Sequence, residues 1–79
     1  MRIKVKLFAA LVNYVSNAKP GIPFDIELPN DSSLSYLINR LNIPQKETNI
    51  IFVNGCSRPL EYILQNNNEV GIFPLIGGG

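Results

Sequence analysis

Polar and apolar residues alternate in the first segment of the chain, residues 2–8. The alternation is typical of a strand with one buried face, and it places Ile3, Val5 and Leu7 on that face. Residues 23–28 alternate in the same way, with acidic side chains on the polar face. In an antiparallel pair these acidic side chains would lie opposite basic ones, and each such pair contributes about 0.2–1 kcal/mol. The pattern predicts that the chain begins with two strands of one sheet.

The clearest helical pattern covers residues 34–42. Its apolar residues follow the spacing i, i+3, i+4 and i+7 of an amphipathic helix, and residues 30–33 before it are rich in helix-capping types. Pro44 ends the pattern, because the residue before a proline disfavours the helical conformation. We expect this helix to be the main cover of the core. Its apolar set is Leu34, Leu37, Ile38 and Leu41.

Shorter elements fill the rest of the chain. Residues 9–15 contain good helix formers and predict a short helix, which ends before the helix-breaking residues 19–21. Residues 50–53 form an apolar run that predicts a strand, and it leads into an Asn-Gly pair at 54–55 that is typical of a hairpin turn.

The last third of the chain contains weaker signals before a final strand. Residues 58–64 predict a short strand and a helical turn, anchored by Leu60, Ile63 and Leu64. Three asparagines at 66–68 predict a turn, because asparagine tolerates positive φ. The last strand then begins at Glu69, and regular pairing is expected to end at Pro74, which has no N–H to donate.

This order of elements predicts an α+β fold of the β-grasp (ubiquitin-like) type. We expect a mixed sheet of four to five strands, one main helix across one face and a short helix after the first strand. In this arrangement the first and last strands lie parallel at the sheet centre, joined through a crossover helix. Residues 1–76 are assigned to the domain and residues 77–79 to a flexible glycine tail.

Composition narrows the classes of function. The chain has 79 residues, 46% of them hydrophobic, and a formal net charge of +1. The charge gives no electrostatic basis for binding nucleic acid, and the apolar runs are too short to cross a membrane. One cysteine, Cys56, and no histidine leave few ligands for a transition metal. We therefore expect a cytoplasmic protein without a metal site, with Cys56 as a small, partly buried residue.

Three phenylalanines fall on the polar side of their strands by alternation. If the first, third and last strands are neighbours, these rings form one exposed apolar patch, and such patches usually mark interfaces. Phe52 and Phe73 are then expected to face solvent in the free protein. The alternative for Phe8 is that it lies at a strand end and turns into the core. The expected interface comprises Phe8, Phe52, Phe73, Pro74, Leu75 and Ile76.

The three glycines at 77–79 have no Cβ, so this tail is expected to be mobile. Extended, three residues span at most about 10 Å, enough to pass through a narrow channel and present a carboxylate to a partner enzyme. The alternative is a frayed terminus or a remnant of cloning without a function.

Several segments together resemble a known family. Residues 6–11 look like the opening of the small subunit of molybdopterin synthase, the MoaD family. Residues 53–55 look like the hairpin motif shared by MoaD and the thiamine sulfur carrier ThiS. Residues 68–74, followed by Gly78 and Gly79, look like the last strand and terminal di-glycine of the family.

The resemblance implies a sulfur carrier that is not itself an enzyme and binds no cofactor. An E1-like enzyme of the MoeB or ThiF type would use ATP to adenylate the Gly79 carboxylate, which would then become a thiocarboxylate. Gly77 and Gly78 would thread the partner's active site. The implied sulfur acceptor is a large synthase subunit of the MoaE type, in molybdopterin biosynthesis.

The sequence leaves three alternative functions open. A ubiquitin-like modifier would use Gly79 to form isopeptide bonds with lysines, after the same activation step. A thiamine-type carrier would pass the sulfur to another pathway. A plain β-grasp binding module would function without Gly79.

Overall fold

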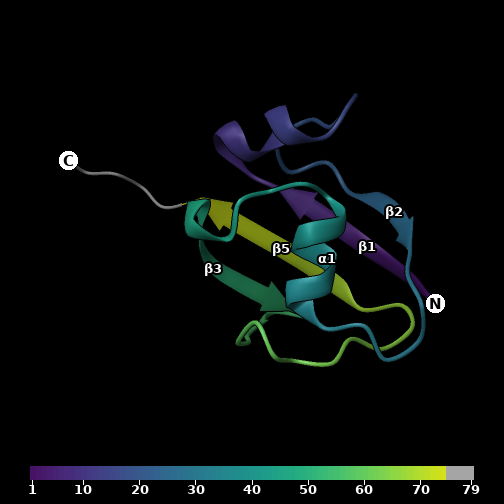
Figure 1. Cartoon of the computed structure of the whole chain (residues 1–79). Helices are drawn as coiled ribbons and strands as arrows, with labels where there is room; N and C mark the ends of the chain where they lie inside the picture. Colours follow the sequence, from purple (N-terminus) through teal and green to yellow (C-terminus); the bar gives the residue numbers. More distant parts are fainter. Residues whose placement is uncertain (75–79) are drawn as a thin grey trace.

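The computed structural model of the chain describes residues 1–74, apart from the side chain of Asn49. It shows a five-stranded mixed sheet with the strand order β2-β1-β5-β3-β4 and an α-helix packed across one face (Figure 1). The predicted β-grasp fold is confirmed. In chain order the elements are β1 Arg2–Leu7, the 3-10 helix η1 Ala9–Tyr14, β2 Phe24–Glu27, α1 Leu34–Arg40, the 3-10 helix η2 Gln45–Glu47, β3 Thr48–Val53, β4 Cys56–Ser57 and β5 Glu69–Pro74.

The sheet is built around β1 and β5, which are parallel neighbours at its centre. The other pairs are antiparallel, including the predicted β1–β2 pair. The side chains of Arg2 and Glu27 approach within 3.6 Å across that pair. Both are well exposed, so this ion pair contributes little to stability. This ion pair therefore does not account for the stability of the sheet, in which the inward-facing side chains of β1 and β5 are buried.

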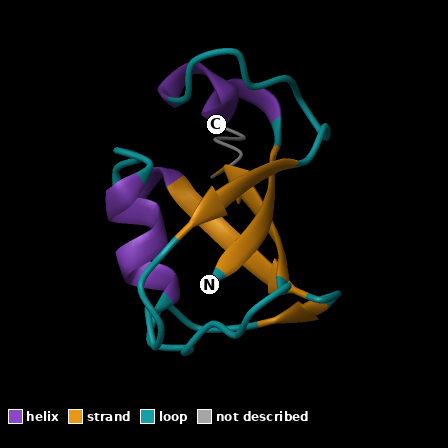
Figure 2. Ribbon diagram, turned by 90° about the vertical axis from the view of Figure 1, so that its right-hand side faces the viewer, coloured by secondary structure: helices purple, strands orange, loops and turns teal. Residues whose placement is uncertain are grey.

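The core lies between the sheet and α1 (Figure 2). Alternate residues of the strands point toward the helix, and the apolar stripe of α1 packs against them, as the sequence predicts. No described helix covers the other face of the sheet. The buried apolar residues are Ile3, Val5, Leu7, Leu11, Leu28, Leu34, Leu37, Ile38, Leu41, Ile43, Ile51, Val53, Leu64, Val70 and Ile72.

The N-terminus of α1 is held by the loop between β4 and β5. Ser33 is the N-cap, and its side-chain oxygen accepts a hydrogen bond from the backbone N–H of Tyr36 at 3.1 Å. The first backbone N–H groups of the helix donate to loop carbonyls, Leu34 to Tyr62 and Ser35 to Leu60, each at 3.0 Å. These bonds satisfy groups that a helix leaves without intrahelical partners.

Residues 58–64 differ from the sequence-based expectation. The strand is only β4, which ends at Ser57, and a single turn follows at Leu60. Leu64 is buried as predicted, but the expected anchor Ile63 is 48% exposed. Ile63 forms an isolated bridge with Ser33, so the backbone there is extended and successive side chains point to opposite sides.

The predicted turns and the short helix are present. Asn54 and Gly55 both have positive φ, 50° and 84°, as a two-residue hairpin of the favoured hand requires. Asn67 also has positive φ, 70°. Residues 9–14 form a 3-10 helix, and Leu11 is its buried residue.

β5 ends at Pro74, where the sequence predicts that regular pairing stops. Residues 75–79, including the expected interface residues Leu75 and Ile76 and the glycine tail, lie outside the described part of the chain. Among residues 1–74, no helix has the length and apolar character needed to cross a membrane.

We predict that Leu37→Ala destabilises the protein by about 2–5 kcal/mol, because Leu37 is fully buried on the inner face of α1 and its truncation leaves a cavity. Denaturant unfolding measures this change. Ile63→Ala, which truncates an aliphatic side chain that is half exposed, is the matched control and should cost less than about 1 kcal/mol. Equal losses for the two variants would contradict the assignment of the core.

Candidate functional site

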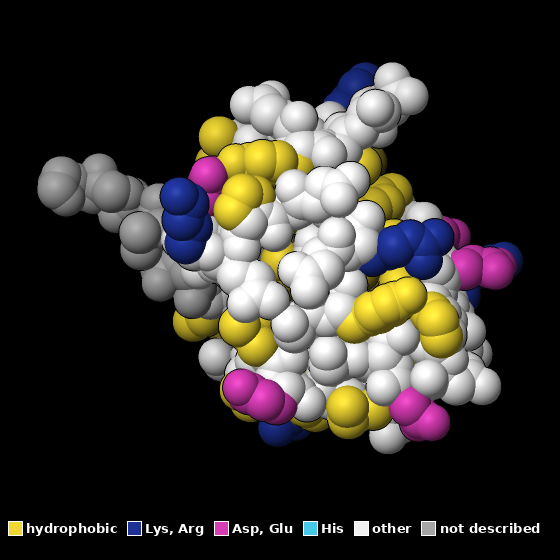
Figure 3. Space-filling view, viewed as in Figure 1, with side chains coloured by type: hydrophobic (Ala, Val, Ile, Leu, Met, Phe, Trp, Pro, Cys, Tyr) yellow, Lys and Arg dark blue, Asp and Glu magenta, His cyan; other side chains and the backbone are white. Residues whose placement is uncertain are grey.

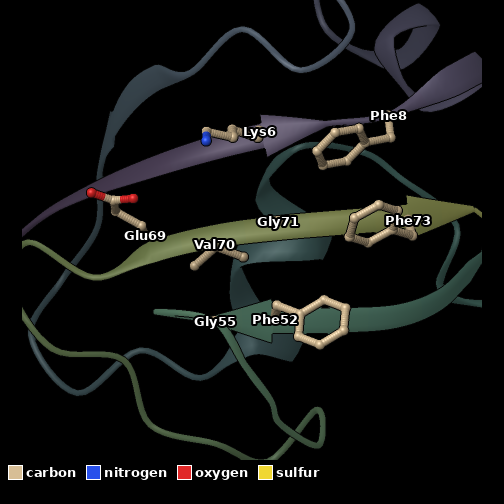
Figure 4. A pocket seen from close by; sticks show the side chains of 8 residues that line it. All are labelled: Lys6, Phe8, Phe52, Gly55, Glu69, Val70, Gly71 and Phe73. Atoms are coloured by element: carbon tan, nitrogen blue, oxygen red, sulfur yellow. The ribbon is translucent and has the colours of Figure 1, made fainter.

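The side chains of Phe8, Phe52 and Phe73 gather on the sheet face that α1 leaves uncovered (Figure 4). The rings of Phe8 and Phe73 are stacked, with centroids 4.2 Å apart and an interplanar angle of 3°. Phe52 meets Phe73 edge-on, with centroids 5.7 Å apart and an angle of 86°. The predicted patch of three aromatic rings is therefore present. We call it the aromatic cluster.

The strand register explains this cluster. Leu7 pairs with Ile72 in β5, so the next residue of each strand, Phe8 and Phe73, points to the opposite face from the core. Phe8 keeps an extended backbone, and its N–H donates to the carbonyl of Ile72 at 3.3 Å. Phe8 thus continues the alternation of β1 past its last residue, and the alternative that it turns into the core is wrong.

The exposure of the rings differs from the sequence-based expectation. Phe52 and Phe73 were expected to face solvent, and both are half-buried, as is Phe8. The reason is that the rings cover one another, since edge-on and stacked contacts remove part of each ring from water. Each ring nevertheless remains partly exposed.

A groove of about 240 Å³ runs along β5 beside the aromatic cluster. Its floor is the backbone at Gly71, which has no side chain to fill the space between β1 and β3. Figure 4 shows the rings at one end of this groove and the charged side chains of Lys6 and Glu69 toward the other. We call it the Gly71 groove. It is lined by Lys6, Phe8, Phe52, Gly55, Glu69, Val70, Gly71 and Phe73.

The strand register determines which charged side chains lie opposite the two lysines of β1, Lys4 and Lys6. Lys4 lies opposite Asp25 in β2 and opposite Glu69 in β5, so it has a carboxylate on both sides. Lys6 lies opposite Gly71, which carries no charge. In the part of the chain that the structure describes, Lys6 has no carboxylate within 4 Å of its ammonium group. Lys6, which lines the Gly71 groove together with the aromatic cluster, is therefore free to contact a partner.

Lys6, Glu69 and Gly71 are groove residues that were not singled out from the sequence. Alternation alone places Lys6 on the face of Phe8, and Gly71 on the face of Phe73. Their meeting in one groove depends on the parallel pairing of Lys6 with Gly71, whose register no local pattern specifies.

The helix face of the molecule has a different surface. Viewed from that side, apolar side chains are separated by polar and charged ones (Figure 3). Ile63 and Tyr36 are exposed, and both line a depression beside the start of α1. The aromatic cluster, by contrast, is a continuous contact of three rings.

The described residues offer few metal-binding or nucleophilic side chains. No group of three or more His, Cys, Asp or Glu side chains is placed to hold a metal ion within residues 1–74. Cys56 is exposed, contrary to the expectation of partial burial, because β4 is a two-residue strand at the sheet edge. Of the expected interface residues, Pro74 is half-buried at the end of β5 and pairs with Thr48.

Several solved structures share this fold at low sequence identity. SAMP1 from Haloferax volcanii has a TM-score of 0.71 at 17% identity, over 100% of both chains. A putative molybdopterin converting factor subunit 1 from Pyrococcus furiosus has a TM-score of 0.75 at 23% identity, over 96% of this chain and 99% of that one. A chain from the complex of molybdopterin-converting factor subunits 1 and 2 of Helicobacter pylori has a TM-score of 0.61 at 20% identity, over 100% of both chains.

No curated protein sequence matches the chain. The model of one protein family, described as Mut7-C ubiquitin, matches residues 1–77. This match spans every described strand and helix, and the structural neighbours agree with it in fold. The chain therefore belongs to the Mut7-C ubiquitin family of ubiquitin-like β-grasp proteins.

Proposed function

We propose that this protein is a sulfur carrier whose Gly79 carboxylate is adenylated by an E1-like enzyme and converted to a thiocarboxylate. The observation that carries the proposal is the direction of β5. The strand runs past the aromatic cluster at Phe73 and ends at Pro74, and the glycines at 77–79 follow it in sequence. The proposed docking surface therefore lies beside the end of β5, the strand that the glycine run follows in sequence.

The chemistry requires a partner enzyme. An α-carboxylate is ionised at neutral pH, so one of its oxygens attacks the α-phosphorus of ATP and expels pyrophosphate. The resulting acyl-adenylate accepts a sulfide-level nucleophile at the acyl carbon and loses AMP, which leaves a thiocarboxylate. Glycine suits both steps because it has no side chain to hinder the approach to the acyl carbon. The carrier supplies the acyl group, and the base and the nucleotide site belong to the enzyme.

The aromatic cluster is the proposed docking surface for this enzyme. Phe8, Phe52 and Phe73 are only half-buried, and apolar surface that is exposed in a continuous patch is favoured at interfaces. Large aromatic side chains at the centre of an interface often carry most of the binding free energy. Pro74, Leu75 and Ile76 are assigned to the same interface because they connect the cluster to the glycines.

Molybdopterin biosynthesis is the pathway that we favour for the sulfur. Support comes from the fold shared with the putative molybdopterin converting factor subunit 1 of Pyrococcus furiosus. In Helicobacter pylori, subunit 1 of the corresponding factor is found in a complex with subunit 2. We accordingly propose a large synthase subunit of the MoaE type as the second partner, which receives the sulfur.

A ubiquitin-like modifier is the second candidate function. The fold is shared with SAMP1 of Haloferax volcanii, which is described as a small archaeal modifier protein. Both functions begin with adenylation, so the activation step does not separate them. Mass spectrometry of the protein from its native cells does. A gain of about 16 Da at Gly79 corresponds to sulfur in place of oxygen, whereas isopeptide-linked conjugates would support the modifier.

We predict that deleting Gly79, or adding one alanine after it, lowers ATP–pyrophosphate exchange by the E1-like enzyme of the same organism at least about 100-fold. A shift of the acyl carbon by even a fraction of a residue length removes it from attacking distance. The amide NMR spectrum of residues 1–74 should stay unchanged, which excludes a folding defect. Normal exchange with either variant would contradict the proposed role of Gly79.

We predict that Phe73→Ala weakens binding to the same enzyme at least about tenfold, because Phe73 contacts both other rings of the cluster. The loss of the ring contacts should lower the free energy of unfolding by only about 0.5–1.5 kcal/mol beyond the lost buried area. Calorimetric titration and thermal unfolding measure the two effects. Tyr36→Ala, an aromatic truncation on the helix face, is the control and should leave binding unchanged. A large loss of stability with unchanged binding would overturn the assignment of the docking surface.

A further inference from the structure

We propose that the Gly71 groove receives one apolar side chain of the activating enzyme and that Lys6 binds a carboxylate next to that side chain. This inference rests on the proposed function and specifies the partner's chemistry: an aliphatic or aromatic residue with an aspartate or glutamate beside it. Three observations carry it, namely the space above Gly71, the ring wall at one end and the uncompensated cation at the other.

The space above Gly71 exists because of the missing side chain. A Cβ at this position would lie 3.6 Å from the ring of Phe8 and 3.8 Å from the ring of Phe73, which are ordinary van der Waals distances. The backbone φ of Gly71 is not in the left-handed region, so the local conformation does not require glycine. Neither strain nor crowding explains the glycine, and its effect is to leave an open slot between β1 and β3.

The walls of the slot suit an apolar side chain. Phe8 and Phe73 close one end, and Phe52 lies opposite Gly71 in β3, so a side chain entering the slot meets three rings. The groove volume of about 240 Å³ accommodates a side chain of the size of leucine or phenylalanine. An apolar anchor in a pocket of this kind is the usual centre of a binding hot spot.

The charges at the other end favour an acidic neighbour. Glu69 also lines the groove, but it lies directly opposite Lys4. Asn54 holds the backbone of Glu69, because its Oδ1 accepts a hydrogen bond from the Glu69 N–H at 2.8 Å. Lys6 has no carboxylate opposite it in β5 and none within 4 Å among the described residues. The register thus places a cation, Lys4, opposite Glu69 but no carboxylate in β5 opposite Lys6, so the Lys6 ammonium is the charge in the groove that a partner's carboxylate would complement.

The first test uses a small probe that carries both chemical groups. Hexanoate combines an aliphatic chain with a carboxylate, and hexylammonium combines the same chain with a cation. In amide NMR titrations of the whole chain, hexanoate should shift the signals of Lys6, Gly71 and Phe73 saturably, and hexylammonium should bind at least about threefold more weakly. The absence of saturable shifts, or equal affinity for the two probes, would overturn the inference.

Variants separate the two parts of the site. Gly71→Val fills the slot and should weaken hexanoate binding at least about tenfold, without lowering the melting temperature, because valine is favoured in strands. Lys6→Gln should equalise the affinities for the two probes. Lys4→Gln removes the same charge from the neighbouring position and should leave the preference for hexanoate intact. If the rings merely cover the exposed backbone of Gly71, Gly71→Val will destabilise the protein and leave probe binding unchanged, which would overturn the inference.

The second test uses the E1-like enzyme of the same organism and separates this inference from the proposed function. If the natural chain is adenylated, Gly71→Val should raise the KM for the carrier at least about tenfold and Lys6→Gln about threefold, with kcat unchanged in both. Unchanged KM values would overturn the inference alone. If the natural chain is not adenylated, the proposed function fails, and the probe titrations decide whether the groove binds an apolar group with a carboxylate.

Discussion

The parallel pairing of β1 with β5 is the constraint on which the rest of this structure depends. It joins residues near the two ends of the described chain, so it forms only when everything between them folds back across the sheet. The right-handed crossover that such a pair needs is provided by α1, which lies over the same two strands and buries their inner side chains. The core and the central pairing therefore stabilise each other, and neither exists alone in a chain of this size.

The same pairing determines what the protein presents to a partner. Because α1 takes one face of the sheet, the other face carries the side chains that alternation directs away from the core. In register, β1 and β5 bring Phe8 against Phe73 and Lys6 against Gly71. The side chains of β1 and β5 that point toward α1 form part of the core, and those that point away from it form part of the candidate site. The glycines at 77–79 follow β5 in sequence, so the proposed chemistry and the proposed docking surface share one strand.

Much of the fold could be predicted from the sequence because its strongest signals are local. Alternation in residues 2–8, the leucine spacing from Leu34 to Leu41 and the Asn54-Gly55 pair each describe an element whose geometry depends on near neighbours. Residues 58–64 could not be predicted in the same way. They carry no regular period, and the backbone of this loop is held by hydrogen bonds from the start of α1, which leave Ile63 exposed and Leu64 buried.

The sequence by itself determined that Phe52 and Phe73 belong to the open face, since a period of two leaves them no place in the core. For Phe8, at the end of its strand, the sequence left two orientations open, and the structure decided between them. The sequence also determined the family resemblance that the match over residues 1–77 supports. Only the tertiary structure decided how these side chains meet. The stacking of Phe8 on Phe73, the half-burial of all three rings and the slot between Lys6 and Phe52 at Gly71 depend on the register of strands far apart in sequence. Register between distant strands is set by the packing of the whole core, and no short segment contains that information.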